Sequence, residues 1–384
     1  MATVIGTGIS AKLDSFTAGK EAALNAYHQI GKNDPSIIII FVSTIFDQET
    51  AIKGVRSIIK DVPLIGCSVM GAISIYGPNR DSITVFMISS DSIAFSCGMG
   101  RNIGKNPRLA GHNAARQASG SRSGPKHLYM MFSDGMAGNH ADILRGSQEI
   151  LGTSFPVIGG GSSGRLCFQK TYQYASDEIQ TDSVAGVLIS GNIKSGEGKS
   201  NGWQAIGKPH KITKAKSNVI KEIDKKIAVQ VYEEYFEKSF MELKNEGICQ
   251  LGVSYPIGTR SGSNGEYITR VPLNIDESGG LVLNADIQEG GDISLMIGDK
   301  DTVLSSAKDA VAEAMGYIKN AKVKFAVMFS DISRLLLLRK DAYKEIDILK
   351  ENIGKNTPIL GCYTFGEYCG YFNNNSVSIA LFSE

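Results

Sequence analysis

The sequence predicts an α/β protein whose mixed sheets are built from internal β-α-β-α-β-hairpin repeats, arranged in two halves. Three observations lead to this prediction. Three short apolar runs are each followed at once by serine, a proline-led apolar strand follows each run after a helical segment, and a similar closing strand ends each unit. The repeats cover residues 3–90, 92–191 and 292–384.

Each repeat is predicted to open with a strand and a helix, in VIGTGIS with 15–30, IAFSCGMG with 107–120 and ISLMIGD with 301–318. The buried second strands are IIIIFV (37–42), HLYMMF (127–132) and KFAVMF (324–329). A helical segment of variable length follows, and then the strand VPLIGC, FPVIGG or TPILGC. The near-copies DSITVFMISSD, TDSVAGVLISG and NNSVSIALFSE close the three units. A period of about 90 residues is too long for a thin solenoid.

The repeats predict a division into domains. Residues 1–191 form an N-terminal domain of two repeats, 192–202 form a linker, and 203–384 form a C-terminal domain that ends in the third repeat. The linker prediction rests on NIKSGEGKSNG, because Gly- and Ser-rich stretches are typical of flexible connections. Residues 192–291 differ in character from the repeats, and whether they are a degenerate fourth copy is open from the sequence.

The composition sets broad limits on location and partners. The chain has 40 Lys and Arg against 39 Asp and Glu, a net charge of +1, so no global field attracts nucleic acid or an anionic membrane. Its apolar runs are far shorter than the roughly 20 residues of a membrane helix, and its start lacks a signal-peptide pattern. Six cysteines without a CxxC pair fit a reducing compartment. We therefore expect a cytoplasmic protein that binds neither nucleic acid nor membrane.

The loops after the repeated strands are the predicted ligand site, because ligands of α/β sheets bind beyond the carboxyl ends of strands. An alternative interpretation is that Ser and Asp in these loops only cap the helices that follow. The candidate residues from the loops are Cys67, Ser68, Ser133, Asp134, Gly160, Gly161, Ser162, Ser330, Asp331, Cys362, Tyr363, Thr364 and Glu367.

Two arginines complete the predicted site. A guanidinium at Arg165 or Arg270 can hold a carboxylate through two hydrogen bonds, while Asp134, Asp331 or Glu367 can receive an ammonium group. A ligand that carries both groups is an amino acid or a similar small polar metabolite. The loop GGGSSGR, at 159–165, does not match the GxxxxGK[ST] pattern of phosphate loops, which argues against a nucleotide.

A thiol-dependent enzyme is an alternative, because Cys67 and Cys362 each lie at a strand end near N–H donors that can lower the pKa of a thiol. The sequence names no base for either thiol, so packed cysteines are favoured over catalytic ones. No metal-binding spacing is present, and we expect no metal and no cofactor. The alternative is a haem with His140 as its single axial ligand.

Several segments together resemble a known family. PLIGCSVMGAIS, FSDGMAGNHADILRG and FPVIGGGSSG are similar to the N-terminal FIST domain. NGWQAIGKPHKITKAKSNVIKEID, YITRVPLNIDESGGLVLNADIQEGGDISLMIGD and PILGCYTFGEYCG are similar to the C-terminal FIST domain. The residues within these motifs are Cys67, Gly71, Gly160, Trp203, Tyr255, Arg270, Gly361, Tyr363, Thr364, Gly366 and Glu367.

The resemblance implies a sensory protein that binds small ligands such as amino acids and passes its signal to a separate output protein. It also implies a haem-based nitric oxide sensor as the alternative, with His140 as ligand. VMGAIS lacks the acidic residue that the family has there, so a carboxylate role rests on Glu367. Trp203 is interpreted as fixing the start of the C-terminal domain. The expected site is a cleft where the two halves meet.

Overall fold

The predicted order of strands and helices is present three times in the computed structural model, which describes residues 3–120, 124–164, 170–261, 266–319 and 321–383. The first repeat consists of β1 Val4–Ser10, α1 Ser15–Ile30, β2 Ile37–Ser43, α2 Gln48–Arg56, β3 Leu64–Val69, β4 Gly71–Ser74, β5 Gly77–Arg80 and β6 Ile83–Ser89. The second consists of β7 Ile93–Arg101, α3 Pro107–Ser119, β8 Lys126–Asp134, α4 His140–Leu151, β9 Val157–Ser162, β10 Gln173–Ala175, β11 Glu178–Gln180 and β12 Ser183–Gly191. The third consists of β13 Lys194–Ser200, α8 Lys300–Ile318, β22 Val323–Asp331, α9 Ile332–Leu338, the 3-10 turn η1 Arg339–Asp341, α10 Tyr343–Ile353, β23 Ile359–Thr364, β24 Glu367–Cys369, β25 Tyr371–Asn373 and β26 Val377–Ser383.

The mixed sheets of these repeats confirm the α/β fold class. In the described part of the chain, no helix combines the length and the apolar character needed to cross a membrane.

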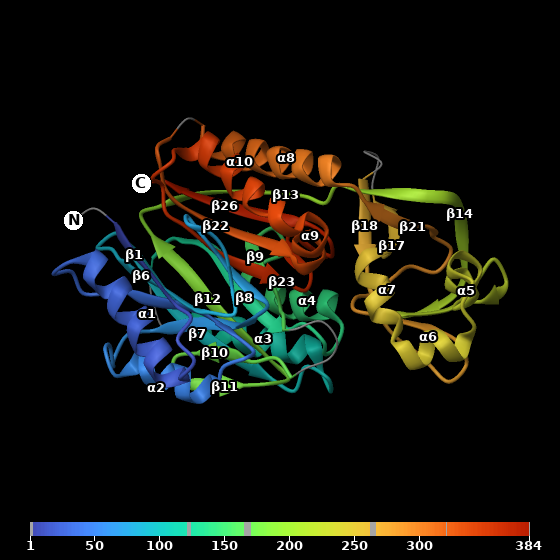
Figure 1. The fold of residues 1–384 in the computed structure, drawn as a ribbon, viewed down its shortest axis with the longest axis horizontal. Coiled ribbons are helices and arrows are strands. Elements are labelled where there is room, and N and C mark those ends of the chain that lie inside the picture. Colours follow the sequence, from blue (N-terminus) through green and yellow to red (C-terminus); the bar gives the residue numbers. More distant parts are fainter. Residues whose placement is uncertain (1–2, 121–123, 165–169, 262–265, 320, 384) are drawn as a thin grey trace.

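Each repeat donates its β-hairpin to the sheet of another repeat. The four long strands of the first repeat are completed by β10–β11 of the second, in the order β1-β6-β2-β3-β10-β11. The second sheet, β25-β24-β9-β8-β12-β7, is completed by the third repeat. The third sheet, β13-β26-β22-β23-β4-β5, is completed by the first. The exchange is cyclic, so each repeat completes the sheet of one neighbour and has its own sheet completed by the other. The hairpin β10–β11 is labelled in Figure 1.

The second strands of the three repeats supply aromatic side chains to one shared core. Phe41, Phe132 and Phe329 occupy equivalent positions, opposite Cys67, Gly160 and Cys362 in their parallel partner strands. The rings of Phe41 and Phe132, and those of Phe132 and Phe329, lie 5.5 Å apart between centroids and meet edge to face. This is a preferred geometry for aromatic pairs. The apolar runs predicted as buried strands therefore join the three sheets.

The first strand of every repeat carries a Gly-x-Gly pair that packs against an alanine-rich helix. An ideal Cβ on any of these glycines would lie 1.8–2.3 Å from a helix carbonyl oxygen, which is closer than a side chain can approach. The pairs are Gly6 and Gly8 under α1, Gly98 and Gly100 under α3, and Gly196 and Gly198 under α8.

β13 corrects the predicted boundaries of the third repeat. The prediction of a linker over 192–202 is wrong, because Lys194–Ser200 form β13 and pair along their whole length with β26. ISLMIGD, predicted as the first strand of this repeat, instead lies in β21 of a separate sheet. β13 is hard to recognise in the sequence KSGEGKS, because its buried positions are glycines and its other positions are polar.

Residues 203–298 form an inserted subdomain between β13 and α8, which extends to one side of the core (Figure 1). Its sheet has the order β18-β17-β21-β14-β15-β20-β19, with β16 paired to β15. All of its described strand pairs are antiparallel, whereas every repeat contains a parallel pair, so this segment is not a fourth copy. Its elements are β14 Trp203–Lys216, β15 Val219–Ile223, β16 Lys226–Ile227, α5 Gln230–Phe236, α6 Phe240–Glu246, α7 Ile248–Ser254, β17 Ile257–Ser261, β18 Glu266–Arg270, β19 Pro272–Ile275, β20 Leu281–Leu283 and β21 Asp292–Gly298.

Three consecutive asparagines of the third repeat tie the inserted subdomain to the core. All three are buried. The bonds run from Thr269 N to Asn373 Oδ1 (2.7 Å), from Asn284 Nδ2 to Asn374 Oδ1 (2.8 Å) and from Asn375 Nδ2 to Val253 O (3.0 Å). Buried amides that find partners in this way fix the position of the subdomain.

The packing of β13 on α8 predicts opposite effects for two Gly→Ala changes. Gly198→Ala should lower the free energy of unfolding by about 1–3 kcal/mol, because overpacking strains the contact; its Cβ would lie 2.0 Å from Ala310 O. Gly316→Ala, within α8, should raise it by about 0.5–1 kcal/mol, because alanine is the better helix former and its Cβ meets no atom within 4 Å. Urea unfolding followed by circular dichroism measures both. Equal effects would contradict this packing.

Candidate functional site

The predicted strand-end loops lie close together, but their side chains are buried. Backbone bonds join the loops of different repeats, from Ser163 N to Ser68 O (3.2 Å) and from Gly161 N to Gly366 O (2.9 Å). Every predicted site residue that the structure describes is buried. Arg165 lies outside the described residues. The loops therefore form a polar interior in which their side chains bond to backbone groups and to other buried side chains.

The strand registers show that equivalent positions in the three loops differ by one residue from those that the sequence alone suggested. Ser43, the serine after the first apolar run, is level with Asp134 and Asp331, not with Ser133 and Ser330. The capping interpretation holds for Asp331, whose Oδ1 accepts a hydrogen bond from Ser333 N at the start of α9. The loop aspartates of the second and third repeats therefore occupy one equivalent position.

The carboxyl group of Glu367 lies in the buried end of the third repeat. Its Oε1 accepts from Thr364 Oγ1 at 2.6 Å, and its Oε2 accepts from Ser376 N at 3.2 Å. Asp331 Oδ2 accepts from Gly366 N at 2.9 Å. Burial raises the pKa of Glu367 well above its ordinary value, and the neighbouring Asp331 raises this pKa further. Burial also raises the pKa of Asp331. The two carboxyls thus favour a state in which Glu367 holds a proton.

The second repeat has an amide where the third has this carboxyl. Gln173 lies opposite Cys67 in the sheet just as Glu367 lies opposite Gly160. Ser183 Oγ donates to Gln173 Oε1 at 2.8 Å, and Gln173 Nε2 donates to Ser162 Oγ at 3.0 Å. A neutral carboxylic acid and an amide offer similar shapes and both donors and acceptors. Glu367 therefore has a structural counterpart, although its loop sequence is unique.

The imidazole of His140 is buried and fully bonded. Its Nε2 lies 3.2 Å from Gly135 O, and its Nδ1 lies 2.7 Å from Tyr368 Oη. Because a carbonyl only accepts, Nε2 carries the proton and Nδ1 accepts from the tyrosine. The ring also stacks on Phe372, with 4.3 Å between centroids. Burial lowers the pKa of His140 to about 4, so the ring is neutral at physiological pH. Axial ligation of a haem would have to break this arrangement.

The two candidate thiols pack against each other in the core. Cys67 and Cys362 are fully buried in the same apolar cluster. Burial raises the pKa of Cys362 well above that of a free thiol. A reactive cysteine needs an accessible thiolate, which this environment disfavours.

Arg270 bonds to the backbone. Its guanidinium donates to the carbonyls of Phe372 (2.8 Å), Thr269 (3.1 Å) and Asp286 (3.2 Å). Burial lowers its pKa to about 10, so it stays charged at neutral pH. The arginine thus helps to attach the inserted subdomain to β25 through its Nε and Nη1 donors.

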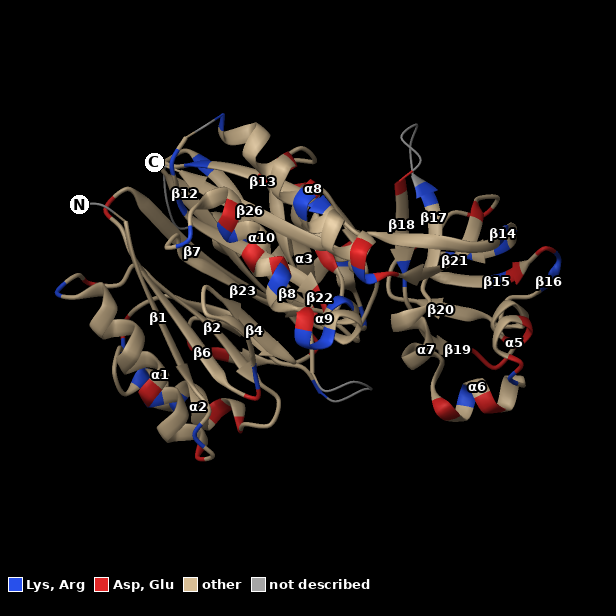
Figure 2. Ribbon diagram, turned by 45° about the horizontal axis from the view of Figure 1, so that its top comes forward, with Lys and Arg blue, Asp and Glu red and all other residues tan. Residues whose placement is uncertain are grey.

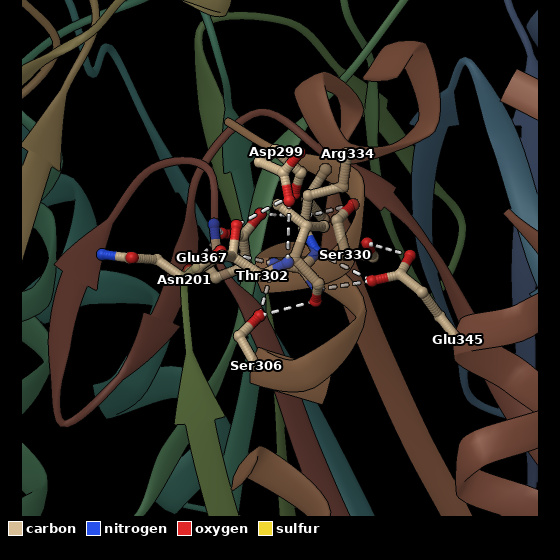
Figure 3. Close-up of polar contacts among 11 residues, drawn as sticks. Asn201, Asp299, Thr302, Ser306, Ser330, Arg334, Glu345 and Glu367 are labelled. Atoms are coloured by element: carbon tan, nitrogen blue, oxygen red, sulfur yellow. Dashed lines mark hydrogen bonds and ion pairs between the residues drawn. The ribbon is translucent and has the colours of Figure 1, made fainter. Parts of the chain in front are cut away.

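A buried ion pair that the sequence reasoning missed holds α9 in place. Arg334 is 0% exposed, and its Nε and Nη2 donate to Glu345 Oε1 at 2.8 and 2.6 Å. The remaining N–H groups reach Asn201 O, Ser306 Oγ and Val303 O, while Ser330 Oγ donates to Glu345 Oε2 (Figure 3). An arginine within the leucine-rich stretch ISRLLLL is the sequence signal for such a pair.

An open cleft of about 1170 Å³ lies between the core and the inserted subdomain. The subdomain contributes Trp203, Ser254, Tyr255 and Ile297, and the core contributes the apolar run 335–337 and Ser333. Trp203 and Tyr255 belong to the motifs that resemble the FIST domains. Trp203 also packs on Gly298 at the junction of the two bodies, in agreement with its predicted anchoring role. Most of this lining belongs to the predicted C-terminal half, 203–384, and only Pro78 and Arg80 come from the N-terminal half, so the cleft is not the expected one between the halves. None of the predicted ligand-binding residues lines it.

The lining of this cleft is strongly basic. Among the described residues that line it, Arg80, Lys300, Arg339 and Lys340 are cationic and none is a carboxylate. Lys300 is paired with Asp341, at 2.9 Å between Nζ and Oδ2. The basic end of α9 lies on the side of the core next to the inserted sheet (Figure 2). Sequence reasoning missed these cations, which come from separate repeats.

The cleft and the buried carboxyls share one wall. Ser333 lines the cleft, and its N–H donates to Asp331 Oδ1 at 2.8 Å. Asn375 Nδ2 donates to Ser333 Oγ at 2.9 Å and to Val253 O of the subdomain at 3.0 Å. Gly366 N bonds to the other oxygen of Asp331. The predicted polar loops therefore form the support behind the cleft.

Family comparison agrees with this architecture. The FIST N domain model matches residues 36–226, and the FIST C domain model matches residues 228–370. The chain belongs to the FIST family. FIST domains are associated with sensory signal transduction. The boundary between the two FIST models falls within β16 of the inserted subdomain, not between two repeats.

Individual similar proteins add little about function. An uncharacterized protein of Methanocaldococcus jannaschii is 24% identical in an alignment of 302 residues that covers 72% of this FIST chain and 57% of that protein. One cyanuric acid hydrolase structure aligns over 100% of both chains with a TM-score of 0.39 and 8% identity. Another, from A. caulinodans, covers 100% and 99% with a TM-score of 0.40 and 9% identity. Scores this low carry no argument about fold or activity.

Glu367→Gln should increase the free energy of unfolding, relative to that of the wild type, as the pH rises. The raised pKa means that the stabilising contribution of Glu367 is fully present below its ordinary pKa of 4.5 and is lost as the pH rises through the folded-state pKa. Glutamine cannot ionise, so the free energy of unfolding of the variant should rise relative to that of the wild type as the pH increases above 4.5. Urea unfolding at a series of pH values measures this difference. Glu149→Gln is the control, because Arg108 lowers the pKa of this exposed carboxyl. Parallel profiles for Glu367→Gln and the wild type would contradict a buried, protonated Glu367.

Breaking the buried ion pair between Arg334 and Glu345 should lower the free energy of unfolding strongly. Arg334→Met should lower the free energy of unfolding by about 3–5 kcal/mol, because Glu345 is left buried without its partner. The double variant Arg334→Met, Glu345→Leu should recover much of this loss. Lys53→Met removes an exposed pair with Glu49 and should change stability by about 0–1 kcal/mol. A loss at Arg334 no larger than that at Lys53 would contradict the account of this pair.

Proposed function

We propose that this FIST protein is a sensor that binds a small polar metabolite, of the class of amino acids and similar compounds, in the cleft between its core and its inserted subdomain. The observation that carries the proposal is the cleft itself, which has a volume of about 1170 Å³ and walls from both bodies. Small-molecule sites are concave, mostly apolar and furnished with a few polar groups. Trp203, Tyr255 and the leucines at 335–337 supply the apolar part, and two serines and four cations supply the polar part.

Binding in this cleft provides a route from ligand to signal. A ligand that contacts both bodies stabilises the arrangement in which both contacts are made. The bodies are joined at the paired strand ends Trp203 and Gly298 and by the buried asparagines at 373–375. The subdomain surface and its position would then report occupancy to a separate output protein. In this proposal Asp331 and Glu367 support the wall of the cleft, and the anion-binding role expected of Arg165 or Arg270 is taken by the cleft cations.

The haem and thiol alternatives receive less support from the geometry. His140 uses both ring nitrogens within the fold, and Cys67 and Cys362 are enclosed in the core.

The test is a thermal-shift screen of the intact protein against the twenty amino acids and common polar metabolites, combined with a variant that fills the cleft. A ligand at 100 times its Kd should stabilise the wild type by about 2.7 kcal/mol. Leu336→Trp should remove this stabilisation because Leu336 lines the cleft. Leu24→Trp, on α1 and 36% exposed, is the control and should keep it. The proposal fails if no compound stabilises the wild type, or if Leu336→Trp responds as the wild type does.

A further inference from the structure

The charge of the cleft indicates the class of its ligand. We propose that the cleft takes an organic anion with at least two negative charges and an apolar body, such as a dicarboxylate or a phosphate monoester, in preference to a zwitterionic amino acid. This inference rests on the proposed function, because it concerns the same cleft. It narrows the ligand from polar metabolites in general to polyanions.

Three cations face the cleft without a carboxylate partner. Arg80 comes from the hairpin β4–β5 of the first repeat, while Arg339 and Lys340 follow α9 in the third. Within the described part of the chain, no ion pair neutralises these three side chains, and the carboxylates next to them in sequence, Asp81 and Asp341, are not part of the lining. An ammonium group would meet like charges here, whereas an anion would relieve their mutual repulsion.

Three exposed arginines outside the cleft are paired with carboxylates, whereas Arg116 and Arg260, also exposed, form no ion pair among the described residues. Arg101 bonds to Glu178, Arg108 bonds to Glu149 at 2.6 Å, and Arg145 bonds to Asp142 at 2.8 Å. Guanidinium groups are suited to binding carboxylates and phosphates through two parallel hydrogen bonds. Two arginines that lack such partners and share a cleft are therefore placed to receive an external anion.

The backbone of Arg339 gives independent support. Its φ of 53° and ψ of −117° correspond to the first central position of a type II′ turn, which strongly favours glycine. Holding a long side chain in this conformation costs free energy that glycine would avoid. An arginine at this position is explained if its side chain has a use, and its place in the lining of the cleft identifies that use as anion binding.

The apolar walls of the cleft indicate that the ligand also has an apolar part. A volume of about 1170 Å³ exceeds what a compact inorganic anion fills. Trp203, Tyr255 and the leucines at 335–337 offer an apolar and aromatic surface beside the cations. We therefore expect aromatic or aliphatic acids to bind more tightly than inorganic phosphate.

Isothermal titration of the intact protein tests this inference with probes that share an aromatic body. Phenyl phosphate carries one doubly ionisable phosphate group and isophthalate carries two carboxylates, so each has two negative charges on an aromatic body. Phenol and isophthalamide are their neutral counterparts, and phenylalanine is the zwitterion. Both anions, or one of them, should bind, and the stronger of the two shows whether phosphate or carboxylate is preferred. The neutral probes and phenylalanine should bind at least tenfold more weakly, because charge-assisted hydrogen bonds are lost.

The variants separate binding from folding. Arg80→Gln and Arg339→Gly should each weaken anion binding by about tenfold or more. Arg339→Gly should at the same time keep or raise the melting temperature, because glycine relieves the backbone strain. Lys32→Gln, an exposed lysine on the first repeat outside the cleft, is the matched control and should change neither property.

Three results would overturn the inference. They are absence of binding by both anions at millimolar concentration, phenylalanine binding as tightly as the anions, and wild-type anion affinity in Arg339→Gly. If an amino acid stabilises the protein in the metabolite screen and Leu336→Trp abolishes its effect, the proposed function stands while the polyanion inference fails. If neither the screen nor the titrations detect binding, both fail.

Discussion

The exchange of hairpins between the repeats is the constraint on which the rest of this structure depends. β10–β11, β24–β25 and β4–β5 each complete a sheet whose long strands belong to another repeat. The exchange is cyclic and encloses the aromatic core around Phe132. Residues 36–226 match the FIST N domain, yet the second sheet within this range is completed by strands from beyond residue 366. The two FIST models therefore describe segments of one interdependent core and not two separate folding units.

The same constraint explains where a ligand can bind. Closing the three sheets on one another buries the strand-end loops, so that Glu367 and Asp331 bond to backbone and hydroxyl groups instead of facing solvent. An open cleft lies where the third repeat departs from the other two. In the first and second repeats a short loop joins the first strand to the first helix, but in the third this connection is the inserted subdomain of residues 203–298. The insertion supplies a second wall and leaves the cations of η1 and of hairpin β4–β5 beside an apolar surface.

Much of the core could be predicted from the sequence, because its elements are local patterns. The apolar runs, the proline-led strands and the closing strands all form the expected elements. β13 could not be recognised from hydrophobicity, because Gly196 and Gly198 are its buried positions; its Gly-x-Gly pair, shared with the first strands of the other repeats, was the available signal. The hairpin exchange leaves no mark in the sequence, since pairing with another repeat uses the same alternation as pairing within one. For the same reason, the burial of Glu367 could not be foreseen, and Arg80 and Arg339 could not be brought together. The family motifs did point toward the cleft through Trp203 and Tyr255.

Native-state hydrogen exchange as a function of denaturant concentration tests the interdependence of the repeats most directly. The most protected amides of β2, β8 and β22 should exchange through one global opening, with the same free energy and the same dependence on denaturant. Amides of the inserted subdomain can open at lower free energy without affecting this result. A lower opening free energy for the central strands of any one repeat would contradict the account, because it would show that this repeat unfolds while the sheets of the other two remain complete.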